Sequence, residues 1–180
     1  MNISNEKPKI AVIGLGYVGL PLAVEFSKQF ETIGFDKDEQ RILDLSQGID
    51  RTHEMNSDEL KKNNFLTFTT DLKKIANSSV YIVTVPTPID SDKKPDFKYM
   101  VQASINVGSI LKNKDLVIYE STVYPGAIEE ICIPILEERI SNLERERMRH
   151  KISAFILSAA LMTVRSEDFG NSGHSLTPVP

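Results

Sequence analysis

The feature that most constrains this chain is a glycine-rich stretch near its start, GLGYVG at positions 14–19. An apolar run, Ile10 to Ile13, precedes it, and an amphipathic segment with Pro21 in its first turn follows it. A second apolar run then ends on Asp36, 22 positions after the first glycine. This order of strand, glycine turn, helix, strand and acid is the arrangement that a dinucleotide site requires.

Each glycine of the turn has a physical role in such a site. Gly14 permits a tight turn off the strand, Gly16 lets the backbone approach a pyrophosphate, and Gly19 lets the helix lie against the sheet. The pyrophosphate would sit on the helix N-terminus, where free N–H groups favour an anion. Asp36 would accept hydrogen bonds from both ribose hydroxyls of NAD and repel the 2′-phosphate of NADP, although Lys37 beside it opposes that preference.

Two alternatives stay open at this point: a tight turn that binds no ligand, and another adenine-containing ligand such as S-adenosylmethionine. The complete glycine motif favours a ligand with a pyrophosphate.

Composition narrows the class of protein further. The length of 180 residues suggests one domain with a small extension. The net charge is −4 with acidic and basic residues interspersed, so the sequence shows no basic patch of the kind that binds nucleic acid. A single cysteine, Cys132, excludes an intrachain disulfide framework and fits a reducing compartment. The longest strongly apolar run, Ile152 to Val164, has 13 residues, whereas a membrane span needs about 20. We therefore expect a soluble cytoplasmic protein without a membrane segment, and we identify no metal site.

Strand-like and helix-like segments alternate along the chain. After Ile10 to Ile13, we predict strands over Thr32 to Phe35, Phe65 to Thr69, Val80 to Val85 and Leu116 to Tyr119. Alternation of this kind indicates an α/β fold, a Rossmann-like, doubly wound parallel sheet in a single domain. Among the intervening helices, the one predicted over Phe97 to Leu111 is expected to place one set of residues on a single face: Val101, Ser104, Ile105 and Gly108.

The last two predicted strands each run into a turn that carries hydroxyl groups. The residues concerned are Thr84, Pro86 and Thr87 after one strand, and Ser121 and Thr122 after the other. Both turns lie at the carboxyl edge of the sheet, where the glycine turn also emerges and where open α/β sheets bind ligands. They are candidate cofactor contacts; the alternative is ordinary turn chemistry.

Two further residues have competing interpretations. Arg41 lies five positions past Asp36, near the adenine end of the proposed ligand, but it could equally be a solvated arginine on a helix surface. Cys132 lies among isoleucines in a helix predicted to begin near Ala127. An apolar setting raises the pKa of a thiol, so we interpret this cysteine as a packing residue.

Three stretches together resemble one family: KIAVIGLGYVGLPLAVEF with GFD after it, VTVPTPID followed by KPD, and YESTVYPG. They resemble the N-terminal NAD-binding domain of the UDP-glucose/GDP-mannose dehydrogenases over residues 8–137. The second and third stretches look most like the branch that oxidises UDP-N-acetylglucosamine or UDP-N-acetylgalactosamine for capsule and O-antigen synthesis. With the flanking Gly14, Leu15, Gly16 and Gly19, the resemblance implies NAD contacts at Tyr17, Val18, Asp36, Arg41, Thr87 and Thr122.

The resemblance also implies an activity and partners. Members of the family form homo-oligomers and oxidise the C6 alcohol of a UDP-sugar to a carboxylate in two steps, with two NAD. A downstream cysteine captures the aldehyde and a lysine and carboxylates assist, while Thr122 is a candidate for a supporting role. We assign no catalytic residue in this chain.

The family pattern is lost after about Glu137. The glutamate motif, the nucleophilic cysteine and the sugar-binding domain of the family are absent, and Cys132 does not match the surroundings of that nucleophile. We divide the chain into an NAD-binding domain over 1–137, a helical extension over 138–165 that does not match the family, and a disordered tail over 166–180.

One hypothesis for this loss is an interrupted reading frame that leaves a foreign tail on a truncated enzyme. The alternative is that Ile152 to Val164 packs as a helix on the domain. Sequencing downstream of the gene separates the two, because the hypothesis requires a family-like coding sequence there. We expect the chain by itself to be inactive in turnover, as an NAD-binding module or an inactive remnant.

Overall fold

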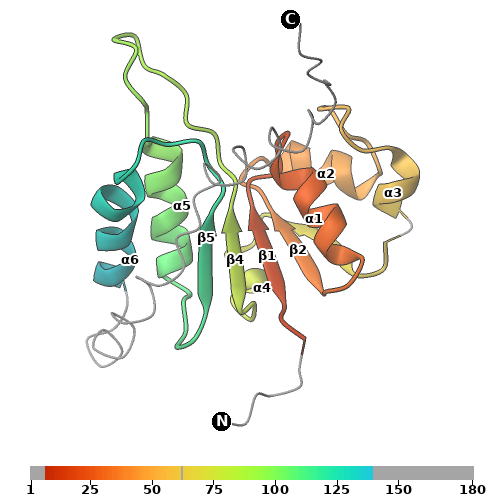
Figure 1. Cartoon of the computed structure of the whole chain (residues 1–180). Helices are drawn as coiled ribbons and strands as arrows, with labels where there is room; N and C mark the ends of the chain where they lie inside the picture. The colour runs from red at the N-terminus through yellow and green to blue at the C-terminus, as the bar shows by residue number, and fades with distance from the viewer. Residues whose placement is uncertain (1–6, 62, 140–180) are drawn as a thin grey trace, which may run out of the picture.

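The computed structural model describes residues 7–61 and 63–139, and these residues form a parallel sheet with helices on both faces (Figure 1). The strands are β1 (Ile10–Ile13), β2 (Thr32–Phe35), β3 (Leu66–Thr69), β4 (Val80–Val83) and β5 (Leu116–Tyr119). Their order in the sheet is β3-β2-β1-β4-β5, and all four pairings are parallel. The predicted α/β, doubly wound fold is therefore confirmed.

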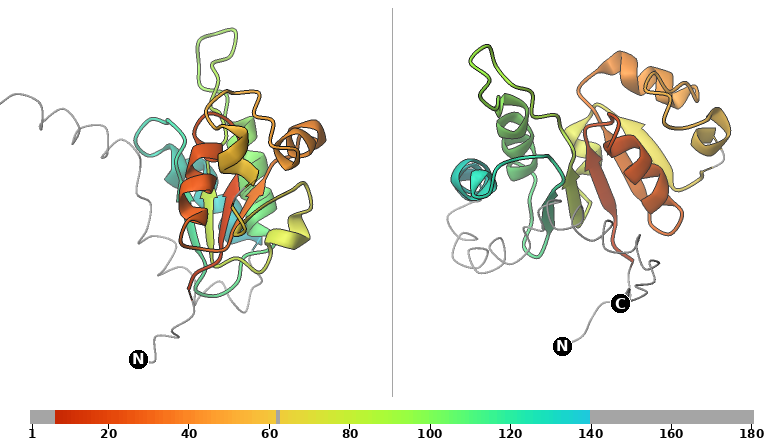
Figure 2. Two further views of the ribbon diagram at one scale, coloured as in Figure 1. Left: turned by 90° about the vertical axis from the view of Figure 1, so that its right-hand side faces the viewer. Right: turned by 45° about the horizontal axis from the view of Figure 1, so that its top comes forward.

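The helices divide into two layers (Figure 2). They are α1 (Gly19–Ser27), α2 (Glu39–Ser46), α3 (Ser57–Lys61), α4 (Leu72–Ile75), α5 (Lys98–Gly108), the π-helical turn η1 (Ile128–Cys132) and α6 (Ile133–Arg139). Alternate residues of β1 belong to two separate core clusters, as expected of a strand that is buried on both faces. One cluster contains residues of α1, α2 and α3, and the other contains residues of α4, α5, η1 and α6.

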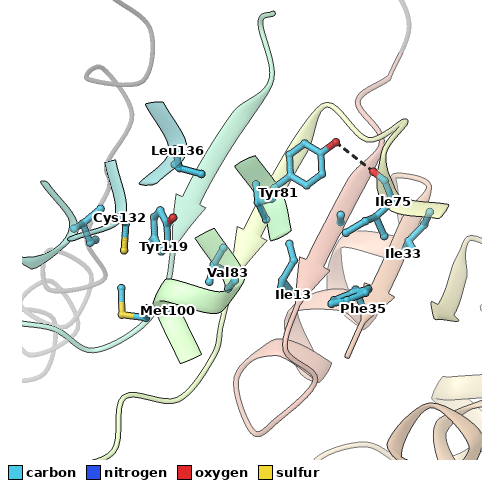
Figure 3. Packing of buried hydrophobic residues seen from close by; sticks show 14 residues of the cluster. Ile13, Ile33, Phe35, Ile75, Tyr81, Val83, Met100, Tyr119, Cys132 and Leu136 are labelled. Carbon is cyan, nitrogen blue, oxygen red and sulfur yellow. Dashed lines mark hydrogen bonds between the residues drawn. The ribbon is translucent and has the colours of Figure 1, made fainter. Parts of the chain in front are cut away.

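The second cluster is drawn in Figure 3. Its aromatic members satisfy their hydroxyl groups inside the core: the Tyr81 hydroxyl lies 3.1 Å from the Ser78 carbonyl, and the Tyr119 hydroxyl lies 2.6 Å from the Ser104 hydroxyl. Burial raises the pKa of both tyrosines, so both stay neutral hydrogen-bonding groups at physiological pH.

The structure differs from the sequence predictions in some details. Strand β4 ends at Val83 rather than Val85, although the Thr84 N–H still donates to the Ile13 carbonyl at 2.9 Å. Helix α5 buries the neighbouring face, with Met100, Ala103 and Val107 in place of Val101 and Ile105. Both sets have helical spacing, so periodicity alone could not choose between them.

The helix predicted from Ala127 begins with a π-helical turn. The Ile133 N–H donates to the Ile128 carbonyl, five residues back. Pro134 has no N–H to offer and its ring crowds the carbonyl of Glu130, which explains why the regular α-helical ladder is interrupted here.

The point where the strand order reverses lies between β1 and β4. The segments that follow these two strands lead to helices on opposite faces, so their carboxyl ends open a crevice. Between β4 and α5 the chain also forms a hairpin, bridged at Ile89 and Pro95, that projects beyond this edge of the sheet (Figure 1).

Over residues 7–61 and 63–139, no helix is long and apolar enough to cross a membrane. Over the same ranges, no three metal-ligating side chains come together. The predicted extension beyond residue 139 and the predicted tail over 166–180 lie outside the described residues.

Candidate functional site

The glycine turn between β1 and α1 is shaped by two positions that cannot carry a side chain. Gly14 has φ of +95°, in the left-handed region that favours glycine. A Cβ on Gly19 would lie 1.8 Å from the Gly14 carbonyl oxygen and 2.4 Å from Thr84 Oγ1. Around Gly16, by contrast, an added Cβ would meet nothing within 4 Å. The turn is therefore closed on its inner side and open at Gly16, where a pyrophosphate would approach.

The peptide groups of Leu15 are held on both sides. The Leu15 N–H donates to Asp36 Oδ2 at 2.8 Å, and the Leu15 carbonyl accepts from Arg41 Nε at 2.9 Å. Because the C=O and N–H bonds of a trans peptide point in opposite directions, a Leu15 carbonyl fixed toward Arg41 directs the Gly16 N–H away from Arg41. Arg41 thereby fixes the direction of the next N–H in the turn.

Arg41 is buried, with 5% of its surface exposed, so its interpretation as a solvated surface residue is wrong. Its Nη1 atom lies 2.8 Å from Asp50 Oδ1, and both side chains of this ion pair are almost fully enclosed. Burial by itself would raise the pKa of Asp50, but hydrogen bonds from Thr52, Met55 and Arg41 outweigh it and hold that pKa far below its usual value. The loop after α2 thus supports the glycine turn through one arginine.

The hydroxyl turns tie the strand ends together through their backbone. Thr84 Oγ1 lies 2.7 Å from the Gly14 carbonyl, Ser121 Oγ donates to the Val85 carbonyl at 2.7 Å, and Thr87 Oγ1 donates to the Thr122 carbonyl at 2.7 Å. Thr84 and Ser121 are each only 8% exposed. The turns after β4 and β5 and the glycine turn therefore form one connected edge.

A cleft of about 370 Å³ opens at this edge, within the size range of ligand sites. Four of the candidate cofactor contacts line it: Gly14, Gly16, Asp36 and Pro86. Tyr17 and Val18 are 70% and 51% exposed in the turn itself. Helix α5 contributes four lining residues that were not predicted from the sequence: Tyr99, Gln102, Ala103 and Asn106. Their i, i+3, i+4, i+7 spacing in the helix after the VPTP turn was the available signal.

The start of α1 fits an anionic group. Val18, at the N-cap position, makes no side-chain capping hydrogen bond, and Pro21 lies in the first turn, where its missing N–H costs little. The N–H groups at the start of a helix and the helix dipole favour a negative charge there. On the other side of the turn, the Asp36 carboxylate accepts the Leu15 and Asp38 N–H groups and keeps lone pairs for further donors.

Cys132 lies away from this cleft and is fully buried. Burial raises the pKa of its thiol, and hydrogen bonds with the Ser104 and Tyr119 hydroxyls oppose this only in part. Figure 3 shows Cys132 and Tyr119 side by side inside the core. A neutral, enclosed thiol is a packing group.

This burial predicts the reactivity of the thiol. In the native chain, Cys132 should react with a disulfide reagent such as DTNB at least about tenfold more slowly than in guanidinium. The reason is that the folded core shields the sulfur from the reagent and keeps the thiol protonated. The measurement is the rate of absorbance change, with the unfolded chain as its own control. Equal rates would contradict the buried position.

A parallel sheet in the order 3-2-1-4-5, a glycine turn at its switch point and an acid after β2 define a Rossmann domain of the dinucleotide-binding class. The model of the UDP-glucose/GDP-mannose dehydrogenase family, NAD binding domain, matches residues 8–155. The chain belongs to this family and contains its NAD-binding domain.

Curated relatives support the assignment. The chain is 56% identical over 130 residues to UDP-N-acetyl-D-glucosamine 6-dehydrogenase of Pseudomonas aeruginosa, a match that covers 72% of this chain and 31% of the relative. It is 51% identical over 131 residues to the enzyme of the same name from Salmonella typhi, covering 73% and 31%. The chain thus spans about a third of the length of these relatives.

Solved structures agree with the sequence matches. The fold matches a UDP-D-ManNAc dehydrogenase from Pyrococcus horikoshii with a TM-score of 0.68 at 32% identity, covering 73% of this chain and 32% of the other. It matches GDP-mannose dehydrogenase from Pseudomonas aeruginosa with a TM-score of 0.68 at 30% identity, covering 72% and 32%. The family match runs to residue 155, past Glu137, while the division of the chain into three segments stays a prediction.

Proposed function

We propose that NAD lies across the carboxyl edge of the sheet, with its pyrophosphate on the glycine turn and its adenosine ribose on Asp36. The observation that carries this proposal is the open space beside Gly16. A Cβ added to Gly16 would have no neighbouring atom within 4 Å, and Gly16 lines the same cleft as Asp36. The N–H groups of the turn and of the start of α1 bind the phosphates in this arrangement.

The other candidate residues act in two ways under this proposal. Tyr17 and Val18 are exposed and contact the cofactor with their backbone, and Pro86 shapes the wall of the cleft. A second group holds the backbone of the turns in place with side-chain hydrogen bonds: Arg41, Thr84, Thr87 and Ser121, with the Leu15 and Thr122 carbonyls as the acceptors of the bonds from Arg41 and Thr87. Thr122 keeps its own exposed hydroxyl for the cofactor or for a supporting role toward the substrate.

We further propose that the complete protein oxidises the C6 alcohol of a UDP-N-acetylhexosamine, the substrate class in the names of the relatives at 56% and 51% identity. NAD, when bound, supplies the hydride acceptor for such an oxidation. The residues of this chain bind and orient the cofactor at the sheet edge. The sugar nucleotide and the copies of a homo-oligomer are the partners that we propose for the complete protein.

A second candidate is binding without turnover by these 180 residues alone, favoured by the full burial of their one thiol. Calorimetric titration with NAD, run beside an assay of NADH formation from UDP-N-acetylglucosamine, separates the two. Binding without NADH supports the NAD-binding module, and NADH formation supports a complete catalytic unit. An absence of NAD binding would overturn the proposed function.

Asp36 gives the sharpest test of the cofactor orientation. Replacing it by asparagine leaves one acceptor oxygen where the carboxylate has two, so a ribose hydroxyl or the Leu15 N–H loses its partner. We expect the Kd for NAD to rise about tenfold or more, and the preference for NAD over NADP to fall, because the charge that repels a 2′-phosphate is gone. Calorimetry with both cofactors measures this.

A matched control is Asp115→Asn, which alters a carboxylate that accepts the Lys112 N–H at 2.8 Å just before β5, at the opposite edge of the sheet. This variant should keep the wild-type Kd for both cofactors. An Asp36→Asn protein with unchanged affinity and preference would show that the ribose lies elsewhere.

A further inference from the structure

Cationic side chains lie near the end of the cleft where Asp36 would hold the adenosine ribose. Lys37 follows Asp36 in the chain, and Arg51 lies in the loop after α2. Arg41 is nearer in sequence than Arg51, but it is enclosed with Asp50 and is not accessible to a ligand. This inference rests on the proposed function, because it concerns what an exposed cation does when a ribose occupies Asp36.

Arg51 is held between two carboxylates. Its Nη2 atom lies 3.0 Å from Asp38 Oδ2, and its Nε atom lies 3.0 Å from Asp44 Oδ2. Asp38 lines the cleft together with Asp36, and the Asp38 N–H donates to Asp36 Oδ1 at 3.0 Å. A single residue, Asp38, therefore connects the guanidinium to the carboxylate that would bind the ribose.

The charges in this cluster support one another. The hydrogen bond to Asp38 and the charges of Asp38, Asp44 and Asp36 raise the pKa of Arg51, so the guanidinium lies within electrostatic reach of Asp36. The Arg41 N–H and the Arg51 guanidinium in turn lower the pKa of Asp38, which is therefore ionised at neutral pH. The Arg51 side chain is 47% exposed, so it can be reached from solvent although its N–H groups already have acceptors.

An arginine in this place is the group that a 2′-phosphate requires. NADP differs from NAD by a phosphate on the 2′-hydroxyl of the adenosine ribose, and a nearby arginine accommodates it in Rossmann domains that bind NADP. A guanidinium binds phosphate through paired N–H donors. In this chain, Arg51 gives such donors to Asp38 and Asp44. The other exposed cation, Lys37, has its Nζ atom 4.8 Å from the centroid of the Tyr99 ring on α5.

We propose that Asp38 and Asp44 form a carboxylate clamp, which withholds Arg51 from the 2′-phosphate of NADP. The selection of NAD then has two components. Asp36 repels the 2′-phosphate, and the clamp occupies the cation that would attract it. Asp38 and Asp44 determine cofactor specificity through Arg51.

The test measures the ratio of the Kd for NADP to the Kd for NAD in the full 180-residue chain, by displacement of bound NADH followed by its fluorescence. The double variant Asp38→Asn/Asp44→Asn keeps the shape of both side chains, and asparagine caps a helix about as well as aspartate at the N-cap of α2. We expect the ratio to fall at least about tenfold, because Arg51 is released to bind the phosphate and the repulsion by the two acids is lost.

Arg51→Met separates these two causes. Added to the double variant, it should raise the ratio again by at least about fivefold, because the phosphate loses a charge-assisted hydrogen-bonding partner. In the wild type, where the clamp occupies Arg51, the same substitution should change the ratio by less than about twofold.

The matched control is Glu25→Gln/Glu31→Gln. It also removes two carboxylates from ion pairs, here with Lys28 and Lys9, but these residues do not line the cleft. The control should leave the ratio unchanged, and thermal melts check that every variant is folded.

Two outcomes would overturn the clamp while the NAD site stands. One is a wild-type ratio in Asp38→Asn/Asp44→Asn. The other is a lowered ratio that persists after Arg51→Met is added, since repulsion by the two acids alone would then account for the selection. Failure of the wild type to bind NAD would overturn the proposed function itself.

Discussion

Replacing Gly19 by alanine is expected to abolish NAD binding and to destabilise the fold by about 2 kcal/mol or more. The added methyl group would lie 1.8 Å from the Gly14 carbonyl oxygen, which is backbone and cannot move aside without opening the turn. Gly19 is the first residue of α1, and alanine has a higher helix propensity than glycine. Propensity alone would therefore stabilise the variant, so a loss of stability must come from the steric clash. Urea unfolding and calorimetric titration with NAD measure the two consequences.

Gly16→Ala is the control for this prediction. Nothing lies within 4 Å of its would-be Cβ, so the free energy of unfolding should change by less than about 0.5 kcal/mol. NAD affinity should still fall, because the methyl group occupies the space proposed for the pyrophosphate. A Gly19→Ala protein as stable as Gly16→Ala would contradict the close approach of α1 to the glycine turn.

Replacing Arg41 by methionine is expected to lower the free energy of unfolding by about 3 kcal/mol, because it leaves Asp50 buried without its cationic partner. The substitution also frees the Leu15 carbonyl, to which Arg41 Nε donates at 2.9 Å, so NAD should bind more weakly. Arg51→Met is the matched control: that arginine pairs with Asp38 and Asp44 but is about half exposed, so its loss should lower the free energy of unfolding far less than the loss of Arg41. Similar losses for both variants would contradict the structural role of Arg41.

The same ion pair predicts a dependence on pH. The pKa of Asp50 in the folded chain lies below the value of about 4 that an unfolded aspartate has. Its contribution to stability is therefore complete above that value and is lost as the pH falls. The difference in free energy of unfolding between the wild type and Asp50→Asn should shrink between about pH 5 and pH 2. A difference that is constant over this range would contradict the ionised, hydrogen-bonded state.

Much of the fold could be predicted from local patterns in the sequence. The bounds predicted for β2 and β5 are those in the structure, because short β-branched runs between turn residues leave little choice. The glycine turn and Asp36 were also predictable, since their spacing is set by the length of one βαβ unit. Pro86 in the cleft followed from its place at a strand end.

What the sequence could not supply depends on contacts between distant segments. From the sequence, Arg41 is indistinguishable from an arginine on a helix surface. Its burial depends on Asp50, nine positions later in the chain, which forms an enclosed ion pair with it. Gln102 and Asn106 have the composition of a solvent-facing helix edge, and only the crossing of α5 beside the ends of β1 and β2 makes them part of a cleft. The π-helical turn before α6 was signalled by Pro134 alone.

The hydrogen bonds from the Thr84, Thr87 and Ser121 hydroxyls to backbone carbonyls affect the rate and the free energy of ligand binding. Together with the two bonds that hold Leu15, they fix the three loops around the cleft through their own backbone. A site that is ordered in advance spends little of the interaction free energy on restricting its own motion. Rapid association without a slow conformational phase, and little change in the loop amide signals beyond direct contact, would be the kinetic and spectroscopic signs of such a receptor.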